Sequence, residues 1–169
     1  MKAITARDFA AWAHATQRYG DGPYLDHLDE VAEIVRALRG HTEPMLDAAY
    51  LHDVVEDTPV TGNFLSEMFG PVVAVAVNMM TDPDGQNRAE RKAALHARLA
   101  KLNRAEHSPR IALVVKAADR LANVRACVRD GKADLLRVYA REHAEFRAAA
   151  HRPGLCDALW DELDALAVE

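Results

Sequence analysis

The chain has 169 residues, which suits one domain that buries a core without disulfides. Its net charge of -5 disfavours binding to a nucleic-acid duplex, because such proteins usually carry a basic surface. Hydrophobic residues make up 50% of the chain, but aromatic residues make up only 6%. Much of the apolar content is alanine and leucine, which favour helices. We therefore expect one all-α domain over residues 1–169.

The sequence also indicates a compartment. The two cysteines, Cys127 and Cys156, are too few for a disulfide framework and form no CxxC pair. The N-terminus carries Arg7 and Asp8 and lacks the apolar stretch of a signal peptide. The longest apolar run, 72–77, is far shorter than the roughly 20 residues that a spanning helix needs. We expect a cytoplasmic protein without a membrane segment.

Glycine- and proline-containing breaks divide the chain, and between them apolar residues recur at intervals of three and four, the helical period. In chain order the breaks fall at 20–23, 40, 57–59, 70–71, 82–85, 108–109, 130–131 and 152–154. This division predicts eight or nine helices.

Local signals refine three of these helices. Segment 72–77 is β-branched and short enough for a strand, but Pro71 before it and Asn78 after it favour a helix. Thr61 is expected to cap the helix that follows it, and so is Ser108, which precedes a proline. Segment 88–104 is basic, which predicts a solvated helix face; alternatively, one or two of its cations reach over a cleft and hold phosphate.

The stretch 50–57 places four side chains that can bind a metal or transfer protons near the end of a helix: His52, Asp53, Glu56 and Asp57. Residues four apart lie on one helical face, so Glu56 is expected to stack on His52. The same spacing places Asp57 beside Asp53, so that all four side chains face one cleft. Buried carboxylates cost several kcal/mol unless they are paired or bind a metal. A His-Asp pair alone is common, but the two additional acids favour a metal site.

Two further residues complete a candidate ligand set. His27 lies on the inward side of the second helical segment, and Asp119 lies inside a helix, where aspartate is unfavourable unless exposed, paired or bound. With His52 and Asp53 they offer two imidazoles and two carboxylates, which suits Mn²⁺ or Fe²⁺ and also Zn²⁺. Such an ion polarises a phosphoryl oxygen and makes a water more acidic.

The two remaining acids, Glu56 and Asp57, follow one turn later. They are placed to orient that water and to move protons to the leaving group. The expected chemistry is hydrolysis of a phosphate ester or anhydride.

These residues, in this order, resemble the HD superfamily of metal phosphohydrolases. The closer resemblance is to the hydrolase domain of the Rel/Spo alarmone enzymes and to stand-alone small alarmone hydrolases. It spans roughly residues 10 to 130, and the HD-x-x-ED extension and the Asp-Arg-Leu-x-Asn helix make it specific. The stretches that carry it are 14–18, 23–27, 51–58 and 116–125.

The resemblance implies a Mn²⁺-dependent enzyme that removes the 3′-pyrophosphate of (p)ppGpp. The residues that match the family's metal ligands are His27, His52, Asp53 and Asp119. Glu56 and Asp57 match its catalytic acidic pair. Arg18 falls near an arginine that packs against the guanine base, and Asn123 matches a residue that contacts the nucleotide. The implied partner is a small phosphorylated nucleotide; no membrane partner is expected, and the sequence carries no signal of oligomeric state.

One segment departs from the family. The residues after Arg18, Tyr19 to Gly22, form a shorter and more acidic loop than the family usually has. This difference leaves two alternatives to the alarmone hydrolase. One is an HD enzyme with the same metal chemistry that acts on another nucleotide or phosphorylated metabolite. The other is a non-catalytic HD module that binds a nucleotide or a protein.

Overall fold

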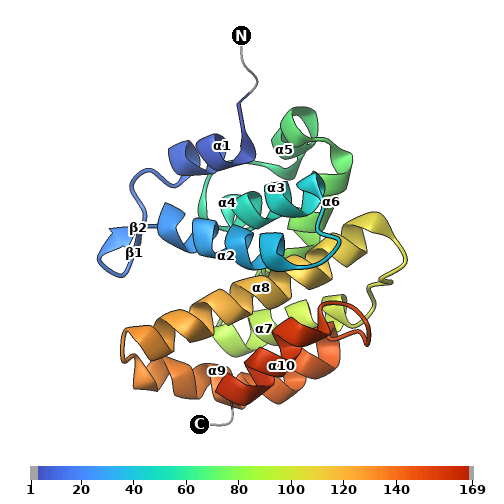
Figure 1. Ribbon diagram of the computed structural model, residues 1–169. Coiled ribbons are helices and arrows are strands. Elements are labelled where there is room, and N and C mark those ends of the chain that lie inside the picture. Colours follow the sequence, from blue (N-terminus) through green and yellow to red (C-terminus); the bar gives the residue numbers. More distant parts are fainter. Residues whose placement is uncertain (1–3, 168–169) are drawn as a thin grey trace.

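The computed structural model describes residues 4–167, and these residues are predominantly helical (Figure 1). In chain order the elements are α1 (Ala6–Ala13), β1 (Arg18–Tyr19), β2 (Gly22–Pro23), α2 (Leu25–Ala37), α3 (Glu43–Leu51), α4 (Val54–Asp57), α5 (Gly62–Phe69), α6 (Pro71–Met80), α7 (Arg88–Leu99), α8 (His107–Arg129), α9 (Ala133–Ala150) and α10 (Asp157–Leu166). Apart from the four-residue turn α4, nine helices are present in this part of the chain. The prediction of an all-α fold of eight or nine helices is confirmed.

Helix α8 is the centre of the fold. It runs between an upper group that contains α1, α2, α3 and α5 and a lower group that contains α7, α9 and α10 (Figure 1). It packs against α2, α3, α6, α9 and α10. Its buried residues are distributed around the whole helix and are not confined to one stripe. This pattern is typical of a helix that is enclosed by other helices on all sides. Three charged residues, Lys116, Asp119 and Arg120, are among the buried residues and require partners.

The local predictions at helix starts have different outcomes. Segment 72–77 lies within α6, so the helix prediction is confirmed. The Thr61 hydroxyl caps α5 by accepting a hydrogen bond from the Phe64 N–H at 3.3 Å, as predicted. The prediction for Ser108 is wrong, because α8 already begins at His107. The Ser108 hydroxyl instead donates to the Val72 carbonyl at 2.9 Å and ties α8 to α6.

The break at 20–23 is a small hairpin that the sequence did not predict as strands. β1 and β2 pair antiparallel, with Tyr19 opposite Gly22. Gly20 in the turn has a φ of 59°, in the left-handed region that glycine adopts without strain. Each strand has only two residues, too few to show the alternation by which strands are recognised. The hairpin precedes α2 directly and fixes where that helix begins.

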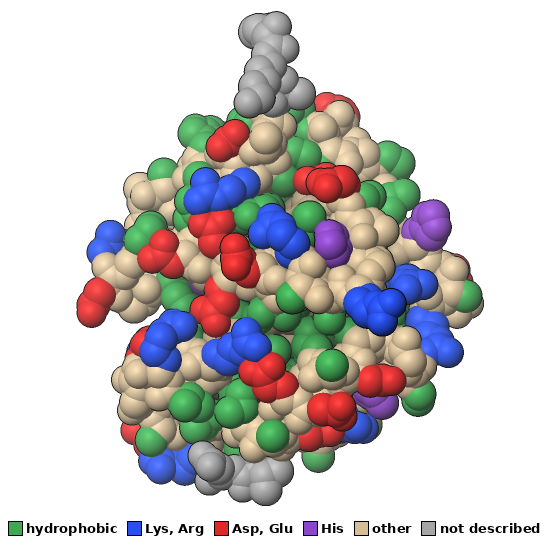
Figure 2. Space-filling model, viewed as in Figure 1, with side chains coloured by type: hydrophobic (Ala, Val, Ile, Leu, Met, Phe, Trp, Pro, Cys, Tyr) green, Lys and Arg blue, Asp and Glu red, His purple; other side chains and the backbone are tan. Residues whose placement is uncertain are grey.

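Charges of both signs are interspersed on the surface. On the face in Figure 2, acidic and basic side chains lie among one another around α2 and below it. Ion pairs join neighbouring helices: Arg7 of α1 binds Asp29 of α2 at 2.7 Å, and Arg125 of α8 binds Glu162 of α10 at 2.7 Å. On this face the two signs of charge are mixed and do not gather into one basic patch. Within residues 4–167 no helix combines the length and apolarity needed to cross a bilayer.

The lower group is held by an aromatic pair, which gives a first testable prediction. Trp160 of α10 and Phe146 of α9 are each 1% exposed, with ring centroids 5.3 Å apart. Replacing Trp160 by alanine removes a large buried side chain and leaves a cavity, so we expect a loss of about 3–5 kcal/mol in the free energy of unfolding. Urea denaturation measures it. The exposed Val128→Ala is the control and should change stability by no more than about 0.5 kcal/mol; a loss below about 1 kcal/mol in Trp160→Ala would contradict this packing.

Candidate metal centre

The His-Asp pair lies in a break between two helices. Helix α3 ends at Leu51, and α4 begins at Val54, so His52 and Asp53 form the connecting turn. The expectation of one continuous helix with His52 and Glu56 stacked on its edge is therefore wrong. The departure is small, because the Asp57 N–H still donates to the Asp53 carbonyl at 2.9 Å. The break separates the pair from the two acids that follow.

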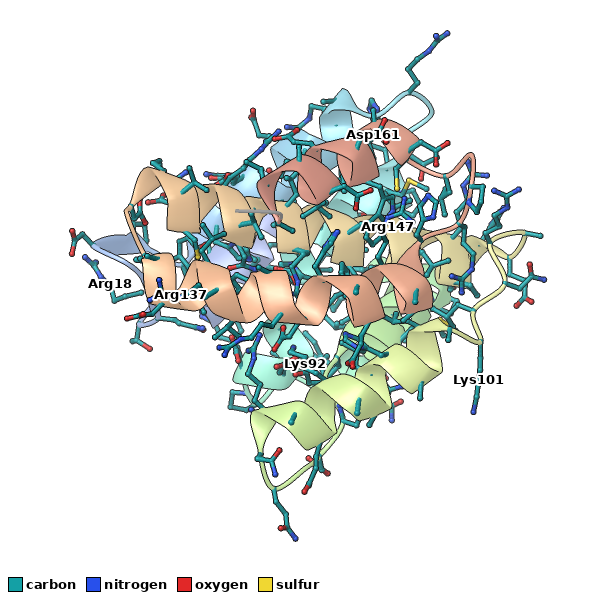
Figure 3. All side chains as sticks on the ribbon, turned by 90° about the horizontal axis from the view of Figure 1, so that it is seen from below. Arg18, Lys92, Lys101, Arg137, Arg147 and Asp161 are labelled. Atoms are coloured by element: carbon teal, nitrogen blue, oxygen red, sulfur yellow. The ribbon has the colours of Figure 1, made fainter. Side chains whose placement is uncertain are left out.

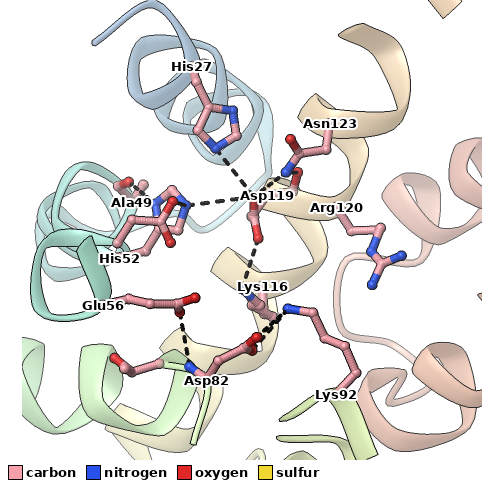
Figure 4. Close-up of polar contacts among 12 residues, drawn as sticks. His27, Ala49, His52, Glu56, Asp82, Lys92, Lys116, Asp119, Arg120 and Asn123 are labelled. Atoms are coloured by element: carbon pink, nitrogen blue, oxygen red, sulfur yellow. Dashed lines mark hydrogen bonds and ion pairs between the residues drawn. The ribbon is translucent and has the colours of Figure 1, made fainter. Parts of the chain in front are cut away.

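Three of the predicted ligands converge at this turn (Figure 4). His27 of α2, His52 and Asp53 each offer a nitrogen or oxygen atom, and these atoms lie within 4.8 Å of one another. The two imidazole rings are 5.5 Å apart, and both are 1% exposed. Such a group of buried donors can hold a divalent ion.

Asp119 approaches the same place from α8. Its Oδ1 lies 3.3 Å from His27 Nε2 and 3.6 Å from His52 Nε2. Its other oxygen, Oδ2, accepts a hydrogen bond from the Lys116 ammonium at 2.9 Å, one turn earlier on the helix. Asn123, one turn later, donates from Nδ2 to Asp119 Oδ1 at 2.6 Å. Both oxygens of this carboxylate are thus held, and Oδ1 faces the two imidazoles.

The orientation of His52 fits a cation in this position. His52 Nδ1 lies 2.8 Å from the Ala49 carbonyl, which only accepts, so Nδ1 must carry a proton. In the neutral ring the lone pair is then on Nε2, which is fully buried without a hydrogen-bond partner. Nε2 faces Asp53 Oδ2 at 3.1 Å as well as Asp119 Oδ1. A lone pair opposed to two carboxylates needs a positive charge between them, and a metal ion provides one.

The electrostatics of the site support the same conclusion. Burial alone would lower the pKa of His52, but the Asp53 and Asp119 carboxylates raise it to about 10. Burial alone would raise the pKa of Asp119, but the Lys116 ammonium and both imidazoles lower it well below its usual value. The pKa of Asp53 is likewise lowered, against the effect of burial, by His52. Both carboxylates are therefore charged at neutral pH and attract a cation, either a proton on His52 or a metal ion.

Glu56 and Asp57 line a separate cavity of about 470 Å³ beside the metal centre. Its other charged lining residues are Asp82, Asp84 and Arg91. Glu56 Oε2 accepts a hydrogen bond from the Asp82 N–H at 3.0 Å (Figure 4). Burial raises the pKa of Glu56 above its usual value, because the charged form is poorly solvated there. Glu56 therefore holds a proton more readily than an exposed glutamate.

Several residues that contact these groups were not predicted. The Tyr24 hydroxyl donates to Asp53 Oδ2. Gln17 donates to Asp57 Oδ2 at 2.8 Å, and its Oε1 lies 2.7 Å from Nδ1 of the buried His14. Lys116 could have been found, because it lies three residues before Asp119 on the same helical face. The contacts of Tyr24 with Asp53 and of Gln17 with Asp57 join residues 29 and 40 positions apart and leave no such signal.

The two predicted substrate contacts lie differently. Asn123 is within the centre, through its bond to Asp119. Arg18 is exposed at the outer edge of the hairpin, where its guanidinium donates to the Asp21 carbonyl (Figure 3). The structure therefore brings Asn123 to the metal ligands but does not bring Arg18 there.

The basic helix α7 is not simply a solvated face. Lys92 points inward and binds Asp82 at 2.7 Å (Figure 3). Arg98 donates to the carbonyls of Asn78 and Thr81 at 3.0 and 2.9 Å. The prediction of a solvated face is wrong for these two residues, which fasten α7 to the end of α6 and to the cavity wall.

The amino-acid sequence is similar to a known family and to several characterised proteins. A family model described as an HD domain matches residues 6–155. The guanosine-3′,5′-bis(diphosphate) 3′-pyrophosphohydrolase MESH1 of Homo sapiens is 40% identical over 126 residues, 72% of this chain and 67% of that protein. The bifunctional (p)ppGpp synthase/hydrolase SpoT of Escherichia coli (strain K12) is 33% identical over 90% of this chain, which spans only 21% of SpoT.

The fold is also shared with a solved structure. It is described as a metazoan ortholog of SpoT that hydrolyzes ppGpp and plays a role in starvation responses. The match has a TM-score of 0.78 and 28% identity, and it covers 95% of this chain and 90% of that one. The four candidate ligands all lie within the matched HD region.

Proposed function

Because the chain belongs to the HD domain family, we propose that it is a metal-dependent hydrolase that removes the 3′-pyrophosphate of guanosine alarmones such as ppGpp. The observation that carries the proposal is the buried, unpartnered His52 Nε2, opposed to two carboxylates. The names of the related MESH1 and SpoT proteins support the choice of substrate.

We further propose that the ligands are His27, His52, Asp53 and Asp119, and that the ion is Mn²⁺. Two nitrogen and two oxygen donors without a thiolate suit Mn²⁺ or Fe²⁺, and Zn²⁺ also accepts them. A bound divalent ion supplies Lewis acidity, which polarises a phosphoryl oxygen and makes a water more acidic. Lys116 keeps Asp119 ionised and oriented, and the Tyr24 hydroxyl does the same for Asp53.

The acidic pair completes the proposed chemistry. Burial raises the pKa of Glu56, which favours its protonated form, and we assign to Glu56 the transfer of a proton to the ribose 3′ oxygen that leaves when water attacks the adjoining phosphorus. Asp57 is held by Gln17 at one oxygen and keeps the other for orienting a water. Asn123 Oδ1 retains a second lone pair for a nucleotide donor. A contact between Arg18 and the guanine base would require its guanidinium to leave the hairpin turn.

A second candidate function follows from the hairpin. The Arg18 guanidinium donates to the Asp21 carbonyl and points outward. In this position Arg18 does not form the expected contact surface for guanine. The same centre could then act on another nucleotide or phosphorylated metabolite.

A turnover assay distinguishes the two candidate functions. The protein is stripped of metal, supplied with Mn²⁺ and incubated with ppGpp beside a panel of nucleotides and sugar phosphates. We expect pyrophosphate release from ppGpp alone, absent in an Asp53→Asn control. Turnover of another compound with ppGpp intact would favour the second candidate, and no turnover of any compound would contradict both.

A further inference from the structure

Tyr19, in the β1–β2 hairpin, reaches the metal centre. Its hydroxyl donates a hydrogen bond to Asn123 Oδ1 at 3.1 Å, across 104 positions of sequence. Its ring lies against the His27 ring, with centroids 4.8 Å apart at an interplanar angle of 31°. The Lys132 ammonium is 5.9 Å from the centroid of the same ring. The half-buried phenol therefore has a fixed position between β1 and the C-terminal half of α8.

The Asn123 amide is fully engaged on the side of Asp119. Its Nδ2 donates to the Asp119 carbonyl at 3.0 Å and to Asp119 Oδ1 at 2.6 Å. If the amide were turned over, its oxygen would face the carboxylate and repel it. The Tyr19 hydroxyl favours the productive orientation, because it offers a proton to the amide oxygen. The donors therefore run in one direction, from the phenol to the amide and from the amide to the carboxylate.

We propose that Tyr19 is a positioning residue that acts through the Asn123 amide to aim Asp119 Oδ1 at the metal ion. The inference rests on the proposed metal site. Lys116 anchors the other oxygen, Oδ2, from within the same helix. Tyr19 and Asn123 thus provide the second anchor, and this anchor connects the hairpin to the metal centre. Hydrogen-bonded partners of this kind commonly contribute about 10–100-fold to metal affinity.

The test is a comparison of Mn²⁺ affinity among single and double variants. Metal-free Tyr19→Phe, Asn123→Ala and the double variant are titrated with Mn²⁺, and the free ion is followed by electron paramagnetic resonance. We expect Tyr19→Phe to weaken binding about tenfold and Asn123→Ala by about 10–100-fold. If Tyr19 acts through Asn123, the double variant should bind no more weakly than Asn123→Ala alone. Turnover of Tyr19→Phe should recover at higher Mn²⁺, which a general loss of structure would not allow.

The matched control is Tyr50→Phe. Tyr50 is a buried tyrosine of α3 that lines a different pocket, together with Arg7 and Asp29 and with none of the four candidate ligands, and its loss of a hydroxyl should leave Mn²⁺ affinity unchanged. Unaltered affinity in Tyr19→Phe, or additive effects of Tyr19→Phe and Asn123→Ala, would overturn the positioning role and leave the metal site standing. Failure of the unmodified protein to bind Mn²⁺ would overturn the metal site and the positioning role together.

Discussion

Asp119→Ala is expected to abolish metal binding and turnover together. Asp119 Oδ1 lies 3.3 Å from His27 Nε2 and 3.6 Å from His52 Nε2, and helix α8, His107–Arg129, contains no other acid that could replace it. Loss of a direct ligand should exceed the roughly 10–100-fold effect of losing a hydrogen-bonded neighbour. We therefore expect Mn²⁺ affinity to fall by more than about 100-fold and ppGpp hydrolysis to become undetectable.

The alanine variant will also be less stable, which calls for a second variant. It leaves the buried Lys116 ammonium, 8% exposed, without its carboxylate, and breaking a buried pair commonly costs about 3–5 kcal/mol. Asp119→Asn keeps the volume and one hydrogen-bond acceptor while removing the charge, so it should fold and still bind little Mn²⁺. Asp164→Asn, a half-exposed acid of α10 paired with Arg147, is the control and should bind Mn²⁺ normally. Tight Mn²⁺ binding by a folded Asp119→Asn would remove Asp119 from the ligand set.

The helices could largely be predicted, because helix periodicity is a local property. Apolar spacing and the Gly-Pro break place α6, and the Thr61 hydroxyl marks the start of α5. The break between α3 and α4 could not be predicted in this way. His52 and Asp53 have φ and ψ of -61°, -32° and -102°, -2°, close to helical values, and neither residue is a helix breaker. The turn follows from tertiary contacts, such as the hydrogen bond from the Tyr24 hydroxyl to Asp53.

At the metal centre, the candidate ligands could be predicted from the sequence, but the residues that orient them could not. Imidazoles and buried carboxylates indicate metal chemistry by themselves, so the sequence predicted residues that the fold does bring together, including Asp119 inside a helix. The residues that orient them carry no such mark. Tyr19, Gln17 and Tyr24 are ordinary polar side chains whose role arises only when the segment around the hairpin packs against α8, α4 and the turn between α3 and α4. Their hydrogen bonds depend on long-range packing, which a spacing rule within one helix does not contain.

Glu56→Gln is expected to separate metal binding from catalysis. Glu56 lies in the cavity beside the ligands and contacts the Asp82 backbone, so its replacement should leave Mn²⁺ affinity unchanged. Glutamine cannot carry a transferable proton. General acid–base groups commonly contribute about 10²–10⁴-fold, so kcat should fall by that factor while Mn²⁺ affinity, measured by titration, stays constant.

The pH dependence of kcat tests the same role. Burial raises the pKa of Glu56, so its protonated form persists to higher pH than that of an exposed glutamate. If the protonated form is the proton donor, kcat falls as the pH rises through this raised pKa. That decline should be absent from the residual activity of Glu56→Gln, because no proton is lost there. Glu67→Gln, at an exposed acid of α5, is the control and should keep both the rate and the pH profile. Full activity in Glu56→Gln, or an unchanged decline with pH, would assign the proton transfer to another group and leave Glu56 as a support for the Asp82 loop.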